Sequence, residues 1–351
     1  MYLKQSINNI SNFYLSYKCI YLFTKKDILI KYDDKNIWKK NIDTQHLLFE
    51  HKNSVFIYTN YKKIEKLNSL NAKLIKKIEE DIFPIETIED KLWVETSINN
   101  EYRVSSVTLD DFEVVNHTSI GNKRVKKIIH NTFLSKNDTD INCYYLDTGK
   151  EVWSFNFQQY TKQINNHLIS NELLVINNLL FLSFANSSLN ATGSIVINTD
   201  TGKVHKEIPS LKGFLYNNNN KEVIATSGIF NNIQTLSIFN LDTEECKTTT
   251  LNTIFPTNNW SIKHQSSVVH NNKLYLAIQQ GETLIASILA VLDLKTNKII
   301  DYYELLKDPK KISNEDNWYH IDKIKVNDSM IAVLTAGGTL HIFEKEETDL
   351  I

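Results

Sequence analysis

A strand–turn–strand unit that recurs along the chain at a spacing of about 44 residues limits the possible folds more than any other feature. The clearest copy is YYLDTGKEVWSFNF, residues 144–157. Residues 144–146 are apolar and strand-forming. The turn follows at Asp147, whose carboxylate can accept hydrogen bonds from the amides ahead of it, and Gly149 tolerates a positive φ. Residues 151–157 then alternate aromatic with smaller side chains, which is the period of a β-strand.

Eight copies of this unit can be placed; seven have a strand, a polar loop, a second strand, a turn and a third strand, and the eighth has the first two strands only. They begin at CIYLFT (19–24), SVFIYTN (54–60), KLWVETS (91–97), NTFLSKN (131–137), LLFLSFA (179–185), EVIATSG (222–228), KLYLAIQQ (273–280) and MIAVLTA (330–336). A further short apolar segment precedes most copies, most clearly at 167–178, 266–272 and 321–328. The repeat is therefore about four strands in about 44 residues, which is the size of a β-propeller blade.

The eighth copy lacks its outermost strand, and the first ten residues, MYLKQSINNI, can supply it. Closing a ring in this way leaves no unpaired sheet edge. The sequence thus predicts the all-β class and a single β-propeller domain of about eight four-stranded blades over residues 1–351. Residues 62–80 have a helix-like composition, but their place in the repeat favours a hairpin. Seven blades is the alternative if this second copy is a loop.

The composition is that of an ordinary globular protein, with 42% hydrophobic and 23% charged residues. A net charge of −2 gives no reason to expect a nucleic acid or membrane partner. The three cysteines, Cys19, Cys143 and Cys246, are far apart and odd in number, so neither a disulfide framework nor a metal site is indicated. The start of the chain does not resemble a signal peptide, and no stretch of about 18 uncharged apolar residues occurs. We expect a cytoplasmic, monomeric bacterial protein.

The run LDTGKEVW (146–153) resembles the repeat of PQQ-like (pyrroloquinoline quinone enzyme type) β-propellers, which are related at the level of fold to WD-repeat propellers. In that repeat an Asp–Thr–Gly run closes the third strand and a Trp follows in the fourth. NTDTGKV (198–204) matches the turn but has no Trp, and IWKKNI keeps a Trp at position 38. The resemblance implies that Trp153 and Trp38 dock one blade against the next. It says little about function, because the fold serves many roles.

The sequence supports few chemistries. A quinoprotein dehydrogenase would need a signal peptide and calcium ligands, and neither is visible. Asp138 and Asp140 lack the Gly and distal Glu of an EF-hand loop, so a solvated loop is favoured. The ten histidines are scattered without metal-ligand spacing. The basic run 123–127 (KRVKK) could contact an acidic partner, but a solvated edge is the preferred interpretation. We predict no catalytic residues, no metal site and no cofactor.

Long variable loops on a rigid scaffold are where binding function concentrates. The largest are expected at 157–166, 185–193, 251–264 and 305–320, at the end of the blades opposite the Asp–Thr–Gly turns. Two of them share an Asn–Trp pair followed by a His, a composition typical of recognition surfaces. The predicted partner-binding residues are Asn259, Trp260, His264, Asp316, Asn317, Trp318, Tyr319 and His320. The alternative is that Trp260 and Trp318 cap the core where each blade begins.

These features favour a non-catalytic protein-binding propeller, with an immunity protein that neutralises a bacterial toxin, or an assembly scaffold, as specific roles. The rival hypothesis is an enzyme or small-ligand binder that uses the central channel. The inner strands would then supply side chains such as His117 or His130, His167, His270 and Asp322.

Overall fold

The computed structural model describes residues 1–17, 19–32, 37–42, 45–59, 63–79, 81–98, 101–161, 166–168, 173–186, 192–208, 212–227, 234–257, 259–281, 285–305 and 319–345. Nearly all regular structure in these residues is β-strand, in antiparallel sheets whose strands mostly follow one another in sequence. The chain divides into two compact units, residues 1–37 with 211–351 and residues 38–210. The prediction of a single domain over 1–351 stays a prediction.

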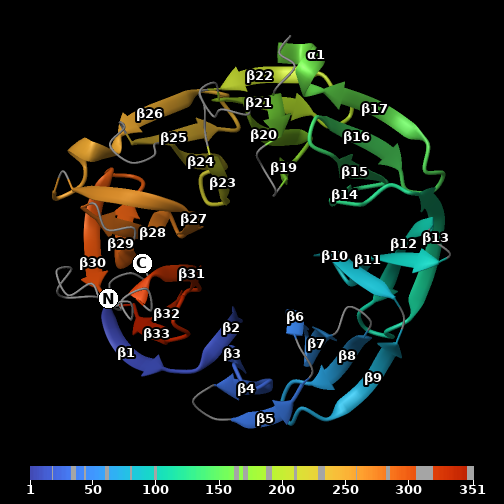
Figure 1. Ribbon diagram of the computed structural model, residues 1–351, viewed down its shortest axis with the longest axis horizontal. Helices are drawn as coiled ribbons and strands as arrows, with labels where there is room; N and C mark the ends of the chain where they lie inside the picture. Colours follow the sequence, from blue (N-terminus) through green and yellow to red (C-terminus); the bar gives the residue numbers. More distant parts are fainter. Residues whose placement is uncertain are drawn as a thin grey trace. The chain divides into compact units, whose positions relative to one another are not determined.

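The unit of residues 38–210 opens with β5 and contains the second to fifth blades. Their strands are β5 (Trp38–Asn41); β6 (Gln45–His51), β7 (Ser54–Thr59), β8 (Lys63–Asn68) and β9 (Leu74–Glu79); β10 (Ile82–Ile88), β11 (Lys91–Ile98), β12 (Glu101–Thr108) and β13 (Val114–Gly121); β14 (Lys127–Ile129), β15 (Thr132–Lys136), β16 (Asp140–Tyr145) and β17 (Glu151–Asn156); and β18 (Asn166–Leu168), β19 (Leu174–Ile176), β20 (Leu179–Asn186), β21 (Thr192–Asn198) and β22 (Val204–Ile208). A five-residue helix, α1 (Phe157–Thr161), follows β17. The second copy of the repeat is the sheet β6-β7-β8-β9, drawn side by side in Figure 1, so the hairpin predicted for 62–80 is confirmed over the described residues 63–79.

The other unit contains the sixth to eighth blades and most of the first. Its strands are β1 (Tyr2–Ile7); β2 (Ile10–Leu15), β3 (Ile20–Thr24) and β4 (Ile28–Tyr32); β23 (Lys212–Asn217), β24 (Glu222–Ser227), β25 (Thr235–Asn240) and β26 (Cys246–Thr250); β27 (Trp260–His270), β28 (Lys273–Gln280), β29 (Ala286–Asp293) and β30 (Lys298–Glu304); and β31 (Ile321–Val326), β32 (Met330–Thr335) and β33 (Leu340–Glu344). A short 3₁₀ helix, η1 (Leu251–Thr253), follows β26. In sheet order β5 comes after β4, which completes eight four-stranded blades, with β18 and β19 sharing one place beside β20. The predicted all-β class and eight blades are confirmed.

The N-terminal strand completes the last blade, as predicted. The sheet order is β1-β33-β32-β31, and Leu3 lies opposite Phe343 in the register of β1 and β33. The sequence makes this pairing favourable because β33 would otherwise expose a strand edge. The chain then enters β2 at Ile10, whose amide donates to the Gly338 carbonyl at 2.9 Å.

The turn between the third and fourth strands of a blade has the same backbone conformation in six of the blades. Its fifth residue has a positive φ each time: Ala72 (57°), Phe112 (57°), Gly149 (64°), Gly202 (68°), Glu244 (56°) and Asn297 (54°). In the fifth blade the amide of this residue donates to the carbonyl of the first turn residue, Asn198, at 2.9 Å. Glycine suits such a position best. Because the chain has only nine glycines, four of these six turns carry a side chain there.

The side-chain acceptor of this turn lies two residues earlier in the sequence than we expected. Asn198, Asn240 and Asp293 hold the first position, and the Oδ1 of each accepts the amides of the third and fourth residues at 2.7–3.0 Å. In the fourth blade the first position is Tyr145, and Asp147 holds the third. In these three blades the amide-binding role that we assigned to the Asp147 carboxylate is therefore held by an Asn or Asp at the first position of the turn.

The two tryptophans of the repeat join successive blades, as the resemblance implied. Trp153 is buried, and its Nε1 donates to the Thr199 carbonyl in the turn of the next blade at 2.7 Å. Trp38 Nε1 makes the equivalent bond to the Ser69 carbonyl at 3.0 Å. Each indole thus fills the space between two blades and donates a hydrogen bond to a turn carbonyl of the next blade.

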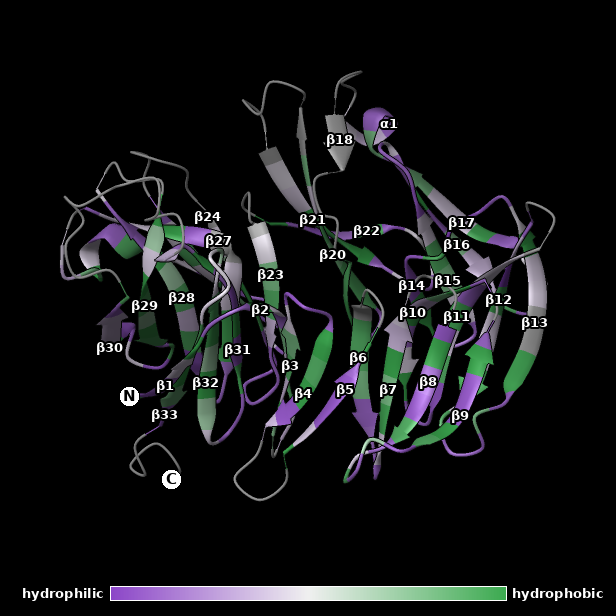
Figure 2. Cartoon of the chain, turned by 60° about the horizontal axis from the view of Figure 1, so that its bottom comes forward, coloured by the Kyte–Doolittle hydropathy of each residue, from purple (hydrophilic) through white to green (hydrophobic). Residues whose placement is uncertain are grey.

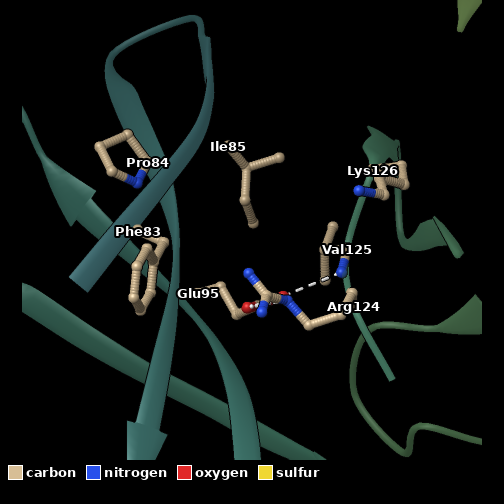
Figure 3. Close-up of a pocket in the computed structure, with 7 residues that line it drawn as sticks. All are labelled: Phe83, Pro84, Ile85, Glu95, Arg124, Val125 and Lys126. Atoms are coloured by element: carbon tan, nitrogen blue, oxygen red, sulfur yellow. Dashed lines mark hydrogen bonds and ion pairs between the residues drawn. The ribbon is translucent and has the colours of Figure 1, made fainter. Parts of the chain in front are cut away.

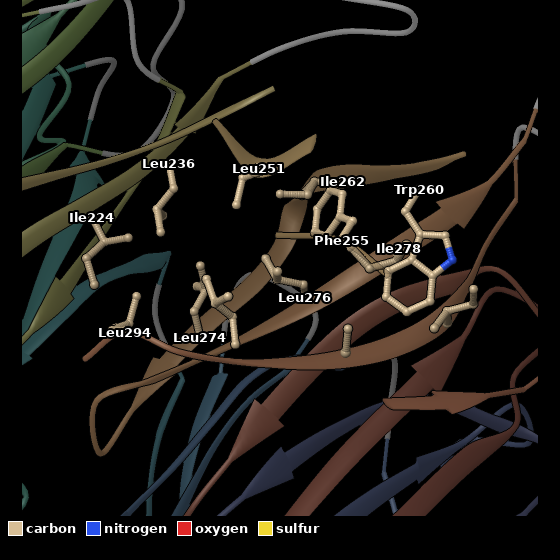
Figure 4. Close-up of a cluster of buried hydrophobic side chains, with 13 residues drawn as sticks. Ile224, Leu236, Leu251, Phe255, Trp260, Ile262, Leu274, Leu276, Ile278 and Leu294 are labelled. Carbon is tan, nitrogen blue, oxygen red and sulfur yellow. The ribbon is translucent and has the colours of Figure 1, made fainter. Parts of the chain in front are cut away.

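The hydrophobic core lies between neighbouring sheets. The cluster in Figure 4 joins Ile224 and Leu236 of the sixth blade to Leu274 and Leu276 of the seventh. The middle strands are buried on both faces, as in β29, where seven of eight residues are buried. Figure 2 shows hydrophobic residues concentrated on the strands rather than on the turns. Near-continuous apolar runs in the middle strands follow from this two-sided burial.

Candidate functional site

The loops that enter the seventh and eighth blades are held against the loops inside those blades. The Gly281 amide donates to the Asn259 carbonyl at 2.7 Å, and the Ala336 amide donates to the His320 carbonyl at 2.8 Å. The Ala286 amide also donates to His320 Nδ1 at 3.0 Å. We call this region, Asn259, Lys263, Gly281, Ala286, Tyr319 and His320, the blade 7–8 rim.

Four of the predicted partner-binding residues can be placed here. Asn259 is exposed, Tyr319 is 39% exposed and His320 is half-buried. The Trp260 ring is only 3% exposed, and it packs against the rings of Phe255 and Tyr302 at centroid distances of 5.9 and 5.3 Å. Trp260 therefore caps the core, which is the alternative that the sequence left open. It is not an exposed anchor, because Tyr302 of β30 and Phe255, which follows η1, cover its ring.

The remaining predicted residues are not placed. His264 contributes backbone to β27, but its side chain is outside the described residues, as are Asp316, Asn317 and Trp318. The inner-strand side chains of the rival hypothesis are dispersed. His270 Nε2 lies 2.9 Å from the Asp328 carboxylate, Asp322 is exposed and His130 is in an exposed turn. His117 and His167 have no described side chain.

Two residues that sequence reasoning missed organise the start of β27. Gln234 is 6% exposed; its Nε2 donates to the Trp260 carbonyl at 2.9 Å, and its Oε1 accepts the Ile262 amide at 2.8 Å. The buried Gln234 side chain of the sixth blade thus binds two backbone groups at the start of β27 in the seventh blade. The second missed residue is Lys263, which neighbours Ile262 on the opposite face of β27.

Lys263 contacts the ring of His320. Its Nζ lies 2.5 Å from His320 Nε2 and 3.1 Å from the Ile321 carbonyl. Burial lowers the pKa of Lys263, an effect that the Asp322 carboxylate opposes. Burial and then the positive charge of Lys263 lower the pKa of His320. Both shifts favour the uncharged forms of the two groups.

A second candidate site is a cavity of about 220 Å³ in the other unit, between the third and fourth blades. Figure 3 shows Phe83, Pro84 and Ile85 on one wall and the Arg124 side chain directed toward Glu95. The Glu95 side chain is only 3% exposed; it accepts the Val125 amide at 2.9 Å and pairs with Arg124 Nε at 2.7 Å. Burial raises the pKa of Glu95.

The basic run 123–127 lies beside this cavity and is partly engaged by its own chain. The Arg124 guanidinium lies over the Tyr102 ring, at 4.6 Å from its centroid, in addition to its pairing with Glu95. Lys127 Nζ pairs with Glu86 at 2.5 Å, and Lys123 Nζ lies 4.9 Å from the Tyr144 ring centroid. Lys126 is exposed at the cavity. Much of the positive charge therefore stabilises the junction of two blades.

Within the part of the chain that the structure describes, no three or more His, Cys, Asp or Glu side chains converge as a metal ion would require. Asp140, a residue weighed as a calcium ligand, instead accepts from Thr139 Oγ1 at 2.7 Å and Asn156 Nδ2 at 2.5 Å. Cys19 and Cys143 are buried and Cys246 is half-buried, and none of the three is in a disulfide. Among the described residues we find no helix with the length and apolar character needed to span a bilayer.

Known proteins resemble this chain in structure but not detectably in sequence. No protein-family model matches it, and no curated protein matches its sequence. BamB from Moraxella catarrhalis matches with 13% identity, a TM-score of 0.55 and coverage of 98% of this chain and 99% of BamB. The WD40 domain of SCAP from fission yeast matches with 10% identity, a TM-score of 0.59 and coverage of 98% and 97%. A europium-containing methanol dehydrogenase matches with 9% identity, a TM-score of 0.54 and coverage of 98% and 93%.

These matches span nearly the whole chain, and the fold is accordingly that of PQQ-like and WD-repeat β-propellers. One of the three proteins is an enzyme by its name. The fold itself therefore does not decide between catalysis and binding, and function has to be argued from the sites.

Proposed function

We propose that this chain is a non-catalytic protein-binding β-propeller whose partner docks on the blade 7–8 rim. The observation that carries the proposal is the exposed Tyr319 side chain beside the anchored His320. Tyr supplies a large contact area with few rotatable bonds. Because its neighbour is already anchored, less conformational entropy is lost when a partner binds. Rigid scaffolds with exposed aromatic residues on their loops are typical of recognition surfaces.

The two ends of the blades differ in a way that supports this choice. The turns at one end repeat a single backbone design six times. The rim at the other end is built from loops of different length and composition, tied together by the Gly281–Asn259 and Ala336–His320 hydrogen bonds. A protein interface of standard size buries about 800 Å² on each side, so neighbouring loops would have to contribute with the rim.

Within this class we propose a bacterial cytoplasmic role, either as an immunity protein that neutralises a toxin or as an assembly scaffold, with the propeller acting as a monomer. A toxin-domain gene beside this gene would favour the immunity role. Co-expression would test it directly, because an immunity protein should restore the growth of cells that express the neighbouring toxin. A scaffold should instead co-purify with several proteins of one assembly.

Affinity purification from the native cell, with mass spectrometry of the co-eluting proteins, tests the proposal. The recovered partner is then titrated against the Tyr319→Ala variant and against Lys298→Ala, which changes an exposed residue at the turn end of the neighbouring seventh blade. Loss of an aromatic anchor should weaken binding by at least about 2 kcal/mol, whereas the turn variant should bind as wild type does. Recovery of no specific protein, or equal binding by wild type and a folded Tyr319→Ala variant, would count against the rim.

The cavity beside Glu95 favours a second candidate function, the binding of a small anion. Arg124 and Lys126 line it with the apolar side chains of Phe83 and Ile85, which suits a carboxylate on a short aliphatic group. Titration calorimetry with butyrate would test this candidate. Binding to wild type that is lost in Lys126→Ala, a substitution at an exposed residue, is the expected result.

A further inference from the structure

The donors and acceptors around His320 do not balance if Lys263 is a charged ammonium. The Ala286 amide donates to Nδ1, so that nitrogen must present its lone pair. A neutral imidazole then carries its proton on Nε2, which is a donor. Lys263 Nζ lies 2.5 Å from this Nε2, and an ammonium has only donors. Two donors would face each other at hydrogen-bond distance.

The contacts balance if Lys263 is a neutral amine. The Nε2–H group of His320 then donates to the Nζ lone pair, and one N–H of Lys263 donates to the Ile321 carbonyl at 3.1 Å. The half-buried position of both side chains favours this uncharged state. The charged group that opposes it is Asp322 on β31, which favours protonation of both Lys263 and His320 but is itself exposed.

We propose that Lys263 is a nucleophilic amine in the folded protein and the site at which a small aldehyde or ketone is captured as an imine. A neutral lysine in a partly desolvated position is the form that attacks carbonyl carbon. Lys263 belongs to the rim proposed for the protein partner, but this inference depends on the contacts of Lys263 and its tests need neither the partner nor Tyr319.

The chemistry balances without an oxidant or reductant. The Nζ lone pair of Lys263 forms a bond to the carbonyl carbon, and one amine proton passes to the carbonyl oxygen to give a carbinolamine. The nitrogen then loses its second proton, the hydroxyl group takes up a proton, and the carbon–oxygen bond breaks to release one water. His320 Nε2–H lies where it can donate a hydrogen bond to the departing hydroxyl group, while solvent water carries the proton released by the nitrogen to that group.

The first test measures the protonation of Lys263 directly. The folded chain is labelled with trace acetic anhydride over a range of pH, and every lysine is then labelled with an isotopic form in the unfolded chain. The isotope ratio of each peptide gives a midpoint that does not depend on how accessible the amine is. We expect the Lys263 midpoint to lie below about 10.4, the ordinary value for lysine. In a folded His320→Ala variant the midpoint should rise, because the donor to the Nζ lone pair is gone. A Lys263 midpoint at or above the ordinary value would overturn the proposal.

The second test traps the imine. Wild-type protein is incubated at pH 7 with propionaldehyde and sodium cyanoborohydride, and the alkylated lysines are identified by mass spectrometry. Lys263 should carry a larger share of the adduct than exposed Lys298, and its excess should disappear in His320→Ala. Labelling of Lys263 no faster than Lys298 would refute a reactive amine. A nitrogen-15 NMR spectrum that places the neutral proton of His320 on Nδ1 would refute the hydrogen-bond assignment on which the proposal rests.

Discussion

Gly202→Ala should destabilise this protein far more than an ordinary glycine substitution. Gly202 has a φ of +68°, a conformation that costs a residue with a Cβ about 1 kcal/mol. A Cβ built on Gly202 would also lie 2.6 Å from two atoms of the Trp153 ring. The ring would have to move, and with it the 2.7 Å hydrogen bond from Nε1 to the Thr199 carbonyl.

The expected loss of stability is the sum of three contributions: the lost hydrogen bond, the displaced ring and the strained backbone. A buried carbonyl left without its donor costs about 1–3 kcal/mol, and displacement of a packed aromatic ring adds about 1 kcal/mol or more. Together with the backbone term, we expect Gly202→Ala to lower the free energy of unfolding by about 3–5 kcal/mol. Gly121 supplies the matched control. Its φ is +65°, and a Cβ there would meet no atom within 4 Å, so Gly121→Ala should cost only the backbone term of about 1 kcal/mol.

Urea unfolding of the two variants, followed by far-ultraviolet circular dichroism, measures the difference. A double-mutant cycle assigns it to the ring: in a Trp153→Ala background, Gly202→Ala should cost only about 1 kcal/mol. The reasoning is refuted if Gly202→Ala and Gly121→Ala agree within about 0.5 kcal/mol, the usual error of additivity. It is also refuted if removal of the ring leaves the cost of Gly202→Ala unchanged.

Three further predictions follow from the same structure. Ala72→Gly, at the same turn position with a φ of +57°, should stabilise the protein by about 0.5–1 kcal/mol, and a lower urea midpoint would contradict this. Burial lowers the pKa of His341, so the unfolded chain takes up a proton that the folded chain resists; stability should therefore fall as pH drops below about 6.5, by at most about 1.4 kcal/mol per pH unit from this group. His341→Gln should unfold with a shallower loss over that window, and identical pH profiles would argue against burial of a neutral ring. Arg124→Ala should cost about 1–3 kcal/mol at pH 7, because it leaves the Glu95 carboxylate buried without its cation. Protonation of Glu95 removes that charge, so the cost should shrink toward pH 4; a cost that grows on acidification would show that the carboxylate is not the cause.

The sequence by itself determined most of the strands and their order, and it favoured eight blades over the alternative of seven. Alternation in segments such as 151–157 and turn residues such as Gly149 act over a few neighbouring residues, so they can be read without knowledge of the fold. Even the pairing of β1 with β33 was predictable, because the last repeat lacked one strand and the first ten residues offered one. The docking role of Trp153 was implied by the resemblance to the PQQ-like repeat, in which a Trp stands at this place.

Only the tertiary structure decided the details of the candidate site. Trp260 is buried because Phe255 and Tyr302 fold over its ring, and no local pattern distinguishes that from an exposed anchor. Lys263 and His320 are 57 residues apart in sequence, and they meet because neighbouring blades bring β27 and the start of β31 together. The physical reason is the range of the interactions. Strand periodicity and turn conformation are set by neighbours in the chain, whereas burial and the protonation of a lysine are set by whichever side chains the fold places around it.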